Sequence, residues 1–97
     1  NYTLDVTLAG APDPETGMII DLKQLKDILD DLVIRELDHK NLNLDVPFLR
    51  GLVPTVESLV IKIWERLDGR IPGCRLHELV LYESRTNFAR YQGPEKD

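Results

Sequence analysis

Apolar residues alternate with polar ones at the start of the chain and then recur every three or four positions in two longer stretches. The alternation covers residues 2–9 and predicts a half-buried strand with one solvated face. Asp21 and Gln24 then form a capping-box pattern that opens a helix. Its apolar stripe consists of Leu22, Leu25, Ile28, Leu29, Leu32, Val33 and Ile34. We expect this helix to end near Asp38.

A second helix is predicted to begin after Thr55, which suits the N-cap position, with Glu57 placed favourably for the helix dipole in the first turn. Gly69 is a natural C-terminal stop. The stripe repeats at helical spacing without interruption, so we expect Trp64 in the core. Its members are Val56, Leu59, Val60, Ile63, Trp64 and Leu67.

Two further strands are predicted at residues 76–83 and 87–91, joined by a short hairpin connection. The order strand, helix, helix, strand, strand predicts an α+β fold, with an antiparallel sheet and two helices packed on one face. The first strand has no sequential hairpin partner. We therefore expect an earlier strand or another subunit to pair with it.

Size and charge restrict the classes of function. Ninety-seven residues form a single domain, 1–97, with 12 basic and 17 acidic residues and a net charge of −5. That balance argues against nucleic acid or anionic lipid as the main partner. No apolar run approaches the ~20 residues that span a bilayer, so no membrane partner is expected. A chain this short buries only about 60–70% of its unfolded surface, so a partner subunit is expected to complete the core.

Cysteine usage and the first residue add two expectations. The single cysteine, Cys74, excludes an internal disulfide and a cysteine-based zinc cluster, and it favours a reducing cytoplasm. Because Cys74 has no nearby histidine or helix start in the sequence, we interpret it as an inert thiol. The chain begins at Asn1, without a methionine or a signal-peptide pattern, and we expect it to be part of a longer protein.

Asp38 and His39 stand side by side where the first helical pattern stops. In one interpretation His39 is simply a cation that stabilises a helix C-terminus. In the other, Asp38 orients the imidazole, which then transfers a proton near neutral pH. Spacing alone favours the helix-end interpretation.

Glu83 also has two interpretations. It is either a carboxylate at the margin of the sheet, solvated or paired with Arg85, or a partly buried acceptor that binds the N–H groups of a ligand. Thr55 and Glu57 are most simply a helix N-terminus, whose free amides could also hold a ligand oxygen. We interpret His77 and Glu78 as surface residues, and the two histidines are too far apart for a zinc pattern.

Several short motifs occur together in order, and as a set they resemble one known family, the 6-pyruvoyl- and 6-carboxy-tetrahydropterin synthases. The resemblance covers essentially the whole chain. The motifs are Asn1-Tyr2, Asp13-Pro14-Glu15-Thr16-Gly17-Met18, Asp21-Leu22-Lys23, Leu37-Asp38-His39-Lys40-Asn41-Leu42, Asp45-Val46-Pro47, Pro54-Thr55-Val56-Glu57, Ile63-Trp64, and Tyr82-Glu83 with Asn87 and Tyr91-Gln92-Gly93.

The resemblance implies a tunnelling-fold subunit in a hexamer of two stacked trimers, with active sites between subunits. It implies a zinc enzyme that acts on 7,8-dihydroneopterin triphosphate, expels triphosphate and rearranges the side chain by proton transfer. By that match Asp38 and His39 belong to the proton-transfer triad and Glu83 anchors the pterin. Thr55 and Glu57 would help to shape the pocket. Ser58 stands where the family more usually has asparagine.

One part of the family pattern is absent. The family's catalytic cysteine and three zinc histidines would lie upstream of Asn1, and Cys74 is at the wrong end of the fold to replace the nucleophile. The chain thus resembles the C-terminal two-thirds of a synthase, without an N-terminal strand and the zinc-ligand segment. The motifs do not separate a pyruvoyl product, on a route to tetrahydrobiopterin, from a carboxy product, on a route to a queuosine-type deazapurine. A non-catalytic pterin-binding or scaffold relative is the alternative.

Overall fold

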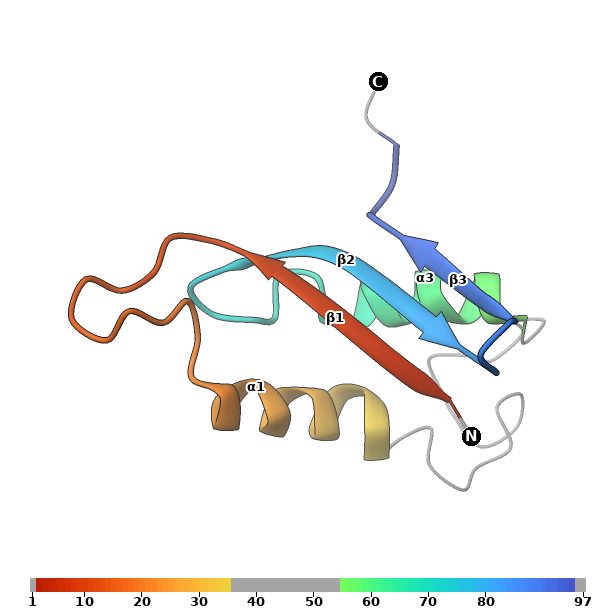
Figure 1. Cartoon of the computed structure of the whole chain (residues 1–97), viewed down its shortest axis with the longest axis horizontal. Helices are drawn as coiled ribbons and strands as arrows, with labels where there is room; N and C mark the ends of the chain where they lie inside the picture. Colours follow the sequence, from red (N-terminus) through yellow and green to blue (C-terminus); the bar gives the residue numbers. More distant parts are fainter. Residues whose placement is uncertain (1, 36–54, 96–97) are drawn as a thin grey trace.

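The computed structural model describes residues 2–35 and 55–95, and Asp38 and His39 lie outside these ranges. The described elements form two layers, a sheet and a pair of helices (Figure 1). In chain order they are β1 (Thr3–Ala9), α1 (Leu22–Leu29), the π-helix η1 (Asp30–Ile34), α3 (Val56–Leu67), β2 (Arg75–Tyr82) and β3 (Phe88–Tyr91). Every helix in the described part of the chain is too short or too polar to span a bilayer.

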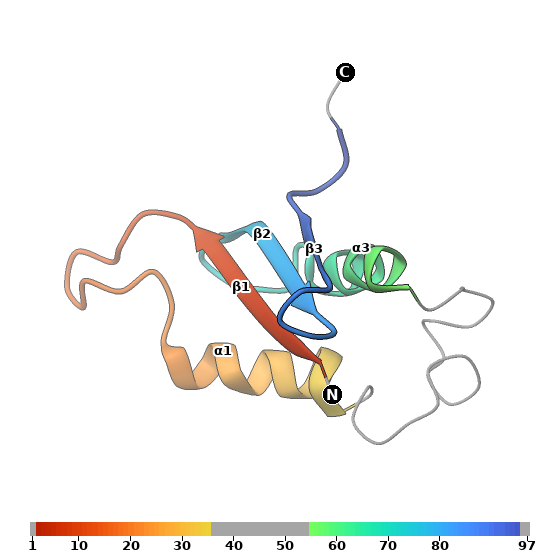
Figure 2. The same ribbon diagram turned by 45° about the vertical axis from the view of Figure 1, so that its right-hand side comes forward.

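The sheet is antiparallel and three-stranded, with the order β1-β2-β3. The first strand has its partner in β2, although the two helices separate them in the sequence, so the expectation that an earlier strand or another subunit supplies its pairing is wrong for this edge. The outer edges of β1 and β3 have no strand partner among the described residues. α3 packs against β2 and β3 while α1 runs alongside β1, and residues of both helical segments join one core (Figure 2). The predicted α+β arrangement, with both helices on one face, is confirmed.

A bulge in β2 places its apolar residues on the core side. Thr7 pairs with Glu78 but Leu8 pairs with Leu76, which leaves His77 as the extra residue. Strict alternation would put Leu76 and Leu79 on opposite faces, because three positions separate them. With His77 as the extra, exposed residue, Leu76, Leu79 and Leu81 all reach the core.

α3 has the predicted start and the predicted buried face. Thr55 Oγ1 accepts from the Ser58 backbone N–H at 3.1 Å, and Ser58 Oγ accepts from the Thr55 N–H at 3.1 Å, a reciprocal capping box. All six residues of the predicted stripe are buried, Trp64 included. The Trp64 and Tyr91 rings meet edge to face, with centroids 5.4 Å apart, which ties α3 to β3.

The first helical segment is less regular. Asp21 caps α1 by accepting from the Lys23 N–H at 3.4 Å, and the segment continues as the π-helix η1, whose end is marked by the Arg35 N–H donating to Asp30 O. Two members of the predicted stripe are wrong: Leu22 is 75% exposed and Ile34 is 44% exposed. Leu22 occupies the first helical position, and Ile34 is turned away because the preceding residue, Val33, faces the core.

Candidate functional site

A hollow of about 490 Å³ opens at the end of the sheet where β1 begins and β2 ends. Thr3 and Asp5 line it, and they alternate with Leu4, which packs against the core. The hollow therefore lies on the sheet face away from the helices. Its volume is in the range of small-molecule sites. The hairpin hollow, as we call it, is lined by Thr3, Asp5, Tyr82, Glu83, Ser84 and Arg85.

Glu83 is held by the turn that joins β2 to β3. The backbone N–H groups of Glu83 and Ser84 both donate to Asn87 O, at 2.9 and 3.2 Å. The Asn87 N–H donates in return to Ser84 Oγ at 3.1 Å. The Asn87 side chain closes the set, because Nδ2 donates to Glu83 Oε1 at 2.7 Å. The turn thus fixes both the main chain and the carboxylate of Glu83.

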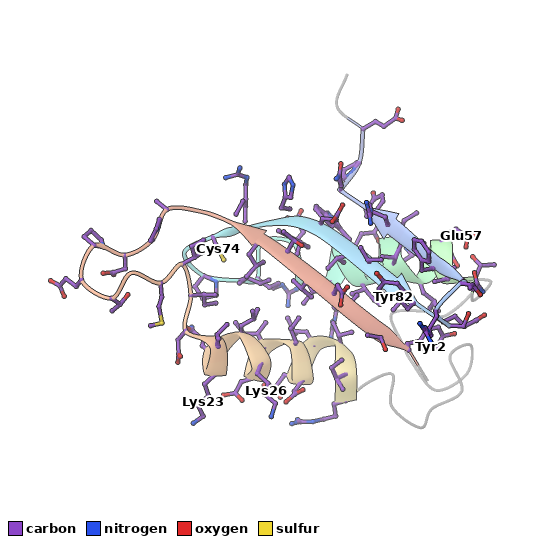
Figure 3. All side chains as sticks on the ribbon, viewed as in Figure 1. Tyr2, Lys23, Lys26, Glu57, Cys74 and Tyr82 are labelled. Atoms are coloured by element: carbon purple, nitrogen blue, oxygen red, sulfur yellow. The ribbon has the colours of Figure 1, made fainter. Side chains whose placement is uncertain are left out.

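The charge on Glu83 is not balanced by a neighbouring cation among the described residues. Arg85 lines the same hollow. It does not form the ion pair with Glu83 that one sequence interpretation had allowed. Glu83 is exposed rather than partly buried, because the hollow is open to solvent. Burial raises the pKa of Tyr2, and the negative charge of Glu83 raises it further. Figure 3 shows Tyr2 and Tyr82 together at this end of the sheet.

The other predicted site residues are placed differently. Thr55 and Glu57 lie at the start of α3, where Thr55 is engaged in the capping box, and neither lines the hairpin hollow. Figure 3 shows Glu57 beyond β3, at the same end of the molecule as Tyr82. Asp38 and His39 are outside the described residues. Of the three predicted residues that the structure describes, only Glu83 lines the hollow.

The described residues do not fit the zinc that the resemblance implies. No group of three His, Cys, Asp or Glu side chains within residues 2–35 and 55–95 could hold a metal ion. Cys74 is half-buried, with Sγ 3.8 Å from Pro72 O.

Glu78, interpreted from the sequence as a surface residue, is partly exposed. Its side chain is only 20% exposed, and Oε1 accepts from Gln92 Nε2 at 3.0 Å and lies 3.5 Å from Arg90 Nε. The β2–β3 ladder begins at the pair Leu79 and Tyr91, so Glu78 lies at the end of the hairpin next to Arg90 and Gln92. His77 itself is exposed, as expected.

Asn87 is the functional candidate that the sequence did not single out for a role. Its position at the first residue of a predicted strand, four residues after a carboxylate, is a weak turn signal. Only the folded turn shows that its amide reaches Glu83. Thr3 and Asp5 were missed for a different reason, since the pairing of β1 with β2 brings them to Glu83.

Comparison with known proteins adds a family match. The model of the family described as 6-pyruvoyl tetrahydropterin synthase matches residues 1–94. The human 6-pyruvoyl tetrahydrobiopterin synthase is 38% identical over 93 residues, which are 96% of this chain and 64% of the human protein. The Synechocystis 6-carboxy-5,6,7,8-tetrahydropterin synthase is 41% identical over 81 residues, covering 82% of this chain and 59% of that protein.

A solved structure shares the fold. The structure of Caenorhabditis elegans 6-pyruvoyl tetrahydropterin synthase superposes with a TM-score of 0.86 at 33% identity, covering 97% of this chain and 67% of that one. The chain thus spans about two-thirds or less of the length of the human, Synechocystis and nematode relatives.

Proposed function

Because the chain belongs to the 6-pyruvoyl tetrahydropterin synthase family, we propose that it forms the pterin-binding part of a carbon–oxygen lyase that acts on 7,8-dihydroneopterin triphosphate. The reaction expels triphosphate and leaves a tetrahydropterin with a modified side chain at position 6. The observation that carries the proposal is the position of Glu83, a carboxylate that is fixed at the hairpin hollow and has no ion-pair partner within residues 2–35 and 55–95, in a chain with this family match.

Glu83 is the pterin anchor in this proposal. A 2-amino-4-oxopteridine presents two adjacent donors, the exocyclic amine and the ring N3–H. An ionised carboxylate has about four acceptor positions and can accept both donors side by side. The Asn87 amide occupies one of these positions on Oε1, so enough acceptors remain for a bidentate contact.

Asp38 and His39 carry the proton transfers in this proposal, and Thr55 and Glu57 help to shape the pocket. We further propose that the active protein is a homo-hexamer, built as a dimer of trimers, with sites between subunits. Two features support assembly: the outer edges of β1 and β3 are unpaired among the described residues, and the hairpin hollow is open on its solvent side. A neighbouring subunit would close the hollow.

The proposal includes a 6-pyruvoyl product on a route to tetrahydrobiopterin. Relatives with that name are matched over 93 residues, against 81 for the 6-carboxy relative. The 41% identity to the 6-carboxy enzyme supports a carboxy product, on a queuosine-type route, as the second candidate. The zinc of the family would be held by residues outside those described. The single cysteine supports a cytoplasmic location.

Turnover of 7,8-dihydroneopterin triphosphate by the full-length protein tests the proposal, with triphosphate release and the pterin product measured and the bound zinc quantified. His39→Ala should lower the turnover rate about 10²- to 10⁴-fold while changing substrate affinity little. If His39 only stabilises a helix end, the variant should instead lose about 0.3–1 kcal/mol of stability and keep its turnover. A protein that binds pterin without turning it over would support the non-catalytic alternative.

Light scattering tests the assembly. We expect a hexamer, or at least a trimer, at the concentrations used for the assay. A monomer that is fully active at micromolar concentration would contradict the proposed sites between subunits.

A further inference from the structure

We propose that Asn87 is a positioning residue for Glu83, which orients the carboxylate for the pterin while leaving its charge intact. The inference rests on the proposed function and adds a residue to it. Asn87 itself does not line the hairpin hollow, so we place it behind the carboxylate rather than in contact with the ligand.

The backbone of the turn brings the two side chains together. Two N–H groups, of Glu83 and Ser84, converge on the Asn87 carbonyl, which fixes the distance between the main chains of residues 83 and 87. The Asn87 amide then donates to Glu83 Oε1 at 2.7 Å, at the short end for an N–H···O bond and typical of a charged acceptor. An exposed glutamate otherwise has several free side-chain torsions, and ordering them on binding costs affinity. The Asn87 amide restricts these side-chain torsions of Glu83 before the ligand binds.

The donor to Glu83 is an uncharged amide, and this matters as much as its position. A lysine or arginine at this distance would fix the carboxylate but also neutralise it, and the ligand would have to displace or share the cation. An amide donates without cancelling the charge. Glu83 therefore keeps its negative charge for the two ligand N–H groups, where charge-assisted hydrogen bonds are stronger than neutral ones.

Other charged and titratable groups surround the carboxylate. Among the described residues, Asp5 of β1 and Arg85 of the turn line the same hollow, as does the phenol of Tyr82. Tyr2, which precedes β1, is close enough for the charge of Glu83 to raise its pKa, in addition to the effect of burial. None of these groups changes in the variants below, so their effects cancel in the comparisons.

The first experiment measures the affinity of the full-length protein for neopterin, a 2-amino-4-oxopteridine, by calorimetry. Asn87→Ala removes the amide but keeps the backbone carbonyl that closes the turn, and we expect binding about 5- to 20-fold weaker than in the native protein. Gln92→Ala is the matched control, since it also removes an amide-to-carboxylate bond across the same hairpin, to Glu78 at 3.0 Å. The control should bind neopterin as the native protein does.

The second experiment uses pH to separate positioning from loosening of the turn. Asn87→Asp is nearly isosteric but places a second carboxylate at hydrogen-bond distance from Glu83. Two such groups share a proton as the pH falls, and the protonated partner is again a donor to the other. The affinity deficit relative to the native protein should be largest at about pH 8 and shrink towards about pH 5.5. A deficit caused by lost packing of the amide in the turn, rather than by loss of its donor, would not depend on pH.

Four outcomes would overturn the inference, and they separate it from the proposed function. Equal affinity of Asn87→Ala and the native protein, with weaker binding by Glu83→Gln, rejects the role of Asn87 and leaves the function standing. An equal loss in Gln92→Ala, or a pH-independent deficit in Asn87→Asp, shows a general effect on the hairpin. Failure of the native protein to bind neopterin overturns both. If Asn87→Ala does not fold, the pH series of Asn87→Asp alone decides.

Discussion

The two ends of the β2–β3 hairpin each hold a glutamate by a side-chain amide, but only one of them also supplies a cation. At the open end, Glu78 accepts from Gln92 Nε2 at 3.0 Å and lies 3.5 Å from Arg90 Nε. At the turn, Glu83 accepts from Asn87 Nδ2 at 2.7 Å and has no ion pair within the described ranges.

Burial explains the difference. The Glu78 side chain is 20% exposed, and a partly buried carboxylate is stabilised by a nearby positive charge. Glu83 is exposed and can remain charged without one. The open end therefore uses its carboxylate for stability, whereas the turn end keeps a fixed carboxylate that pairs with no cation in the described part of the chain and that a ligand can use.

Gly93, next to the open end, should tolerate no side chain. Its φ is +96°, and a Cβ there would lie 2.8 Å from Cζ2 of Trp64. We expect Gly93→Ala to lower the free energy of unfolding by about 2–4 kcal/mol, through strain and overpacking together. Urea unfolding measures it. The control is Gly69→Ala, where φ is +77° but nothing lies within 4 Å of the added Cβ. Equal losses in the two variants would remove the steric argument.

Neutralising Glu83 should weaken ligand binding, whereas neutralising Glu78 should lower the stability of the fold. Glu83→Gln leaves an N–H facing a ligand N–H, and unpaired polar groups of this kind cost about 1–3 kcal/mol, so neopterin should bind at least about tenfold more weakly. Glu78→Gln should leave that affinity unchanged and lower the stability instead. Calorimetry and a thermal melt on both variants check the pair. Equal dissociation constants for native protein and Glu83→Gln would reduce Glu83 to a residue at the sheet margin.

The ion pair at the open end should contribute modestly. Arg90 is 60% exposed on its side chain, so solvent screens its interaction with Glu78. Arg90→Ala should cost about 0.2–1 kcal/mol of stability, less at high salt, without affecting neopterin binding. A double-mutant cycle with Glu78→Gln isolates the pair. A coupling energy indistinguishable from zero would mean that Gln92 alone holds Glu78.

The part of the fold that the sequence predicted is the part determined locally. The α3 stripe and its Thr55 cap depend on residues within a few positions of one another, and both are confirmed. The pairing of β1 with β2 and the bulge at His77 depend on strands that are distant in the sequence. No periodicity within either strand could indicate them.

The site residues also divide into those that the sequence indicates and those that only the fold brings together. Glu83 could be singled out because it ends a predicted strand of β-forming residues and because of the family motifs. Its neighbours Thr3 and Asp5 come from the paired strand, and its partner Asn87 from the geometry of a turn. The roles of Asp38 and His39 stay predictions, because they lie outside the described residues.

The smallest expected effect is on the pKa of Tyr2, which responds to the negative charge of Glu83. Burial is the main cause of its raised pKa, and the charge of Glu83 is the second. Glu83→Gln should therefore lower the pKa of Tyr2 towards its ordinary value without restoring it fully, and Glu78→Gln should not change it. An ultraviolet titration of tyrosinate measures this, with Tyr2→Phe used to subtract the other tyrosines. An unchanged titration in Glu83→Gln would show that burial alone acts on Tyr2.

The raised pKa of Tyr2 also makes the stability of the fold decrease at alkaline pH. Between the ordinary and the raised pKa of Tyr2, the folded state keeps a proton that the unfolded state has lost. The stability linked to this proton is fully present below the ordinary pKa and is lost as the pH rises through the raised one. Tyr2→Phe should remove this alkaline decline, and Glu83→Gln should reduce it. Because Tyr2 is 37% exposed, we expect a small change, visible only as a difference between unfolding curves at alkaline pH. A decline that persists unchanged in Tyr2→Phe would assign it to other groups.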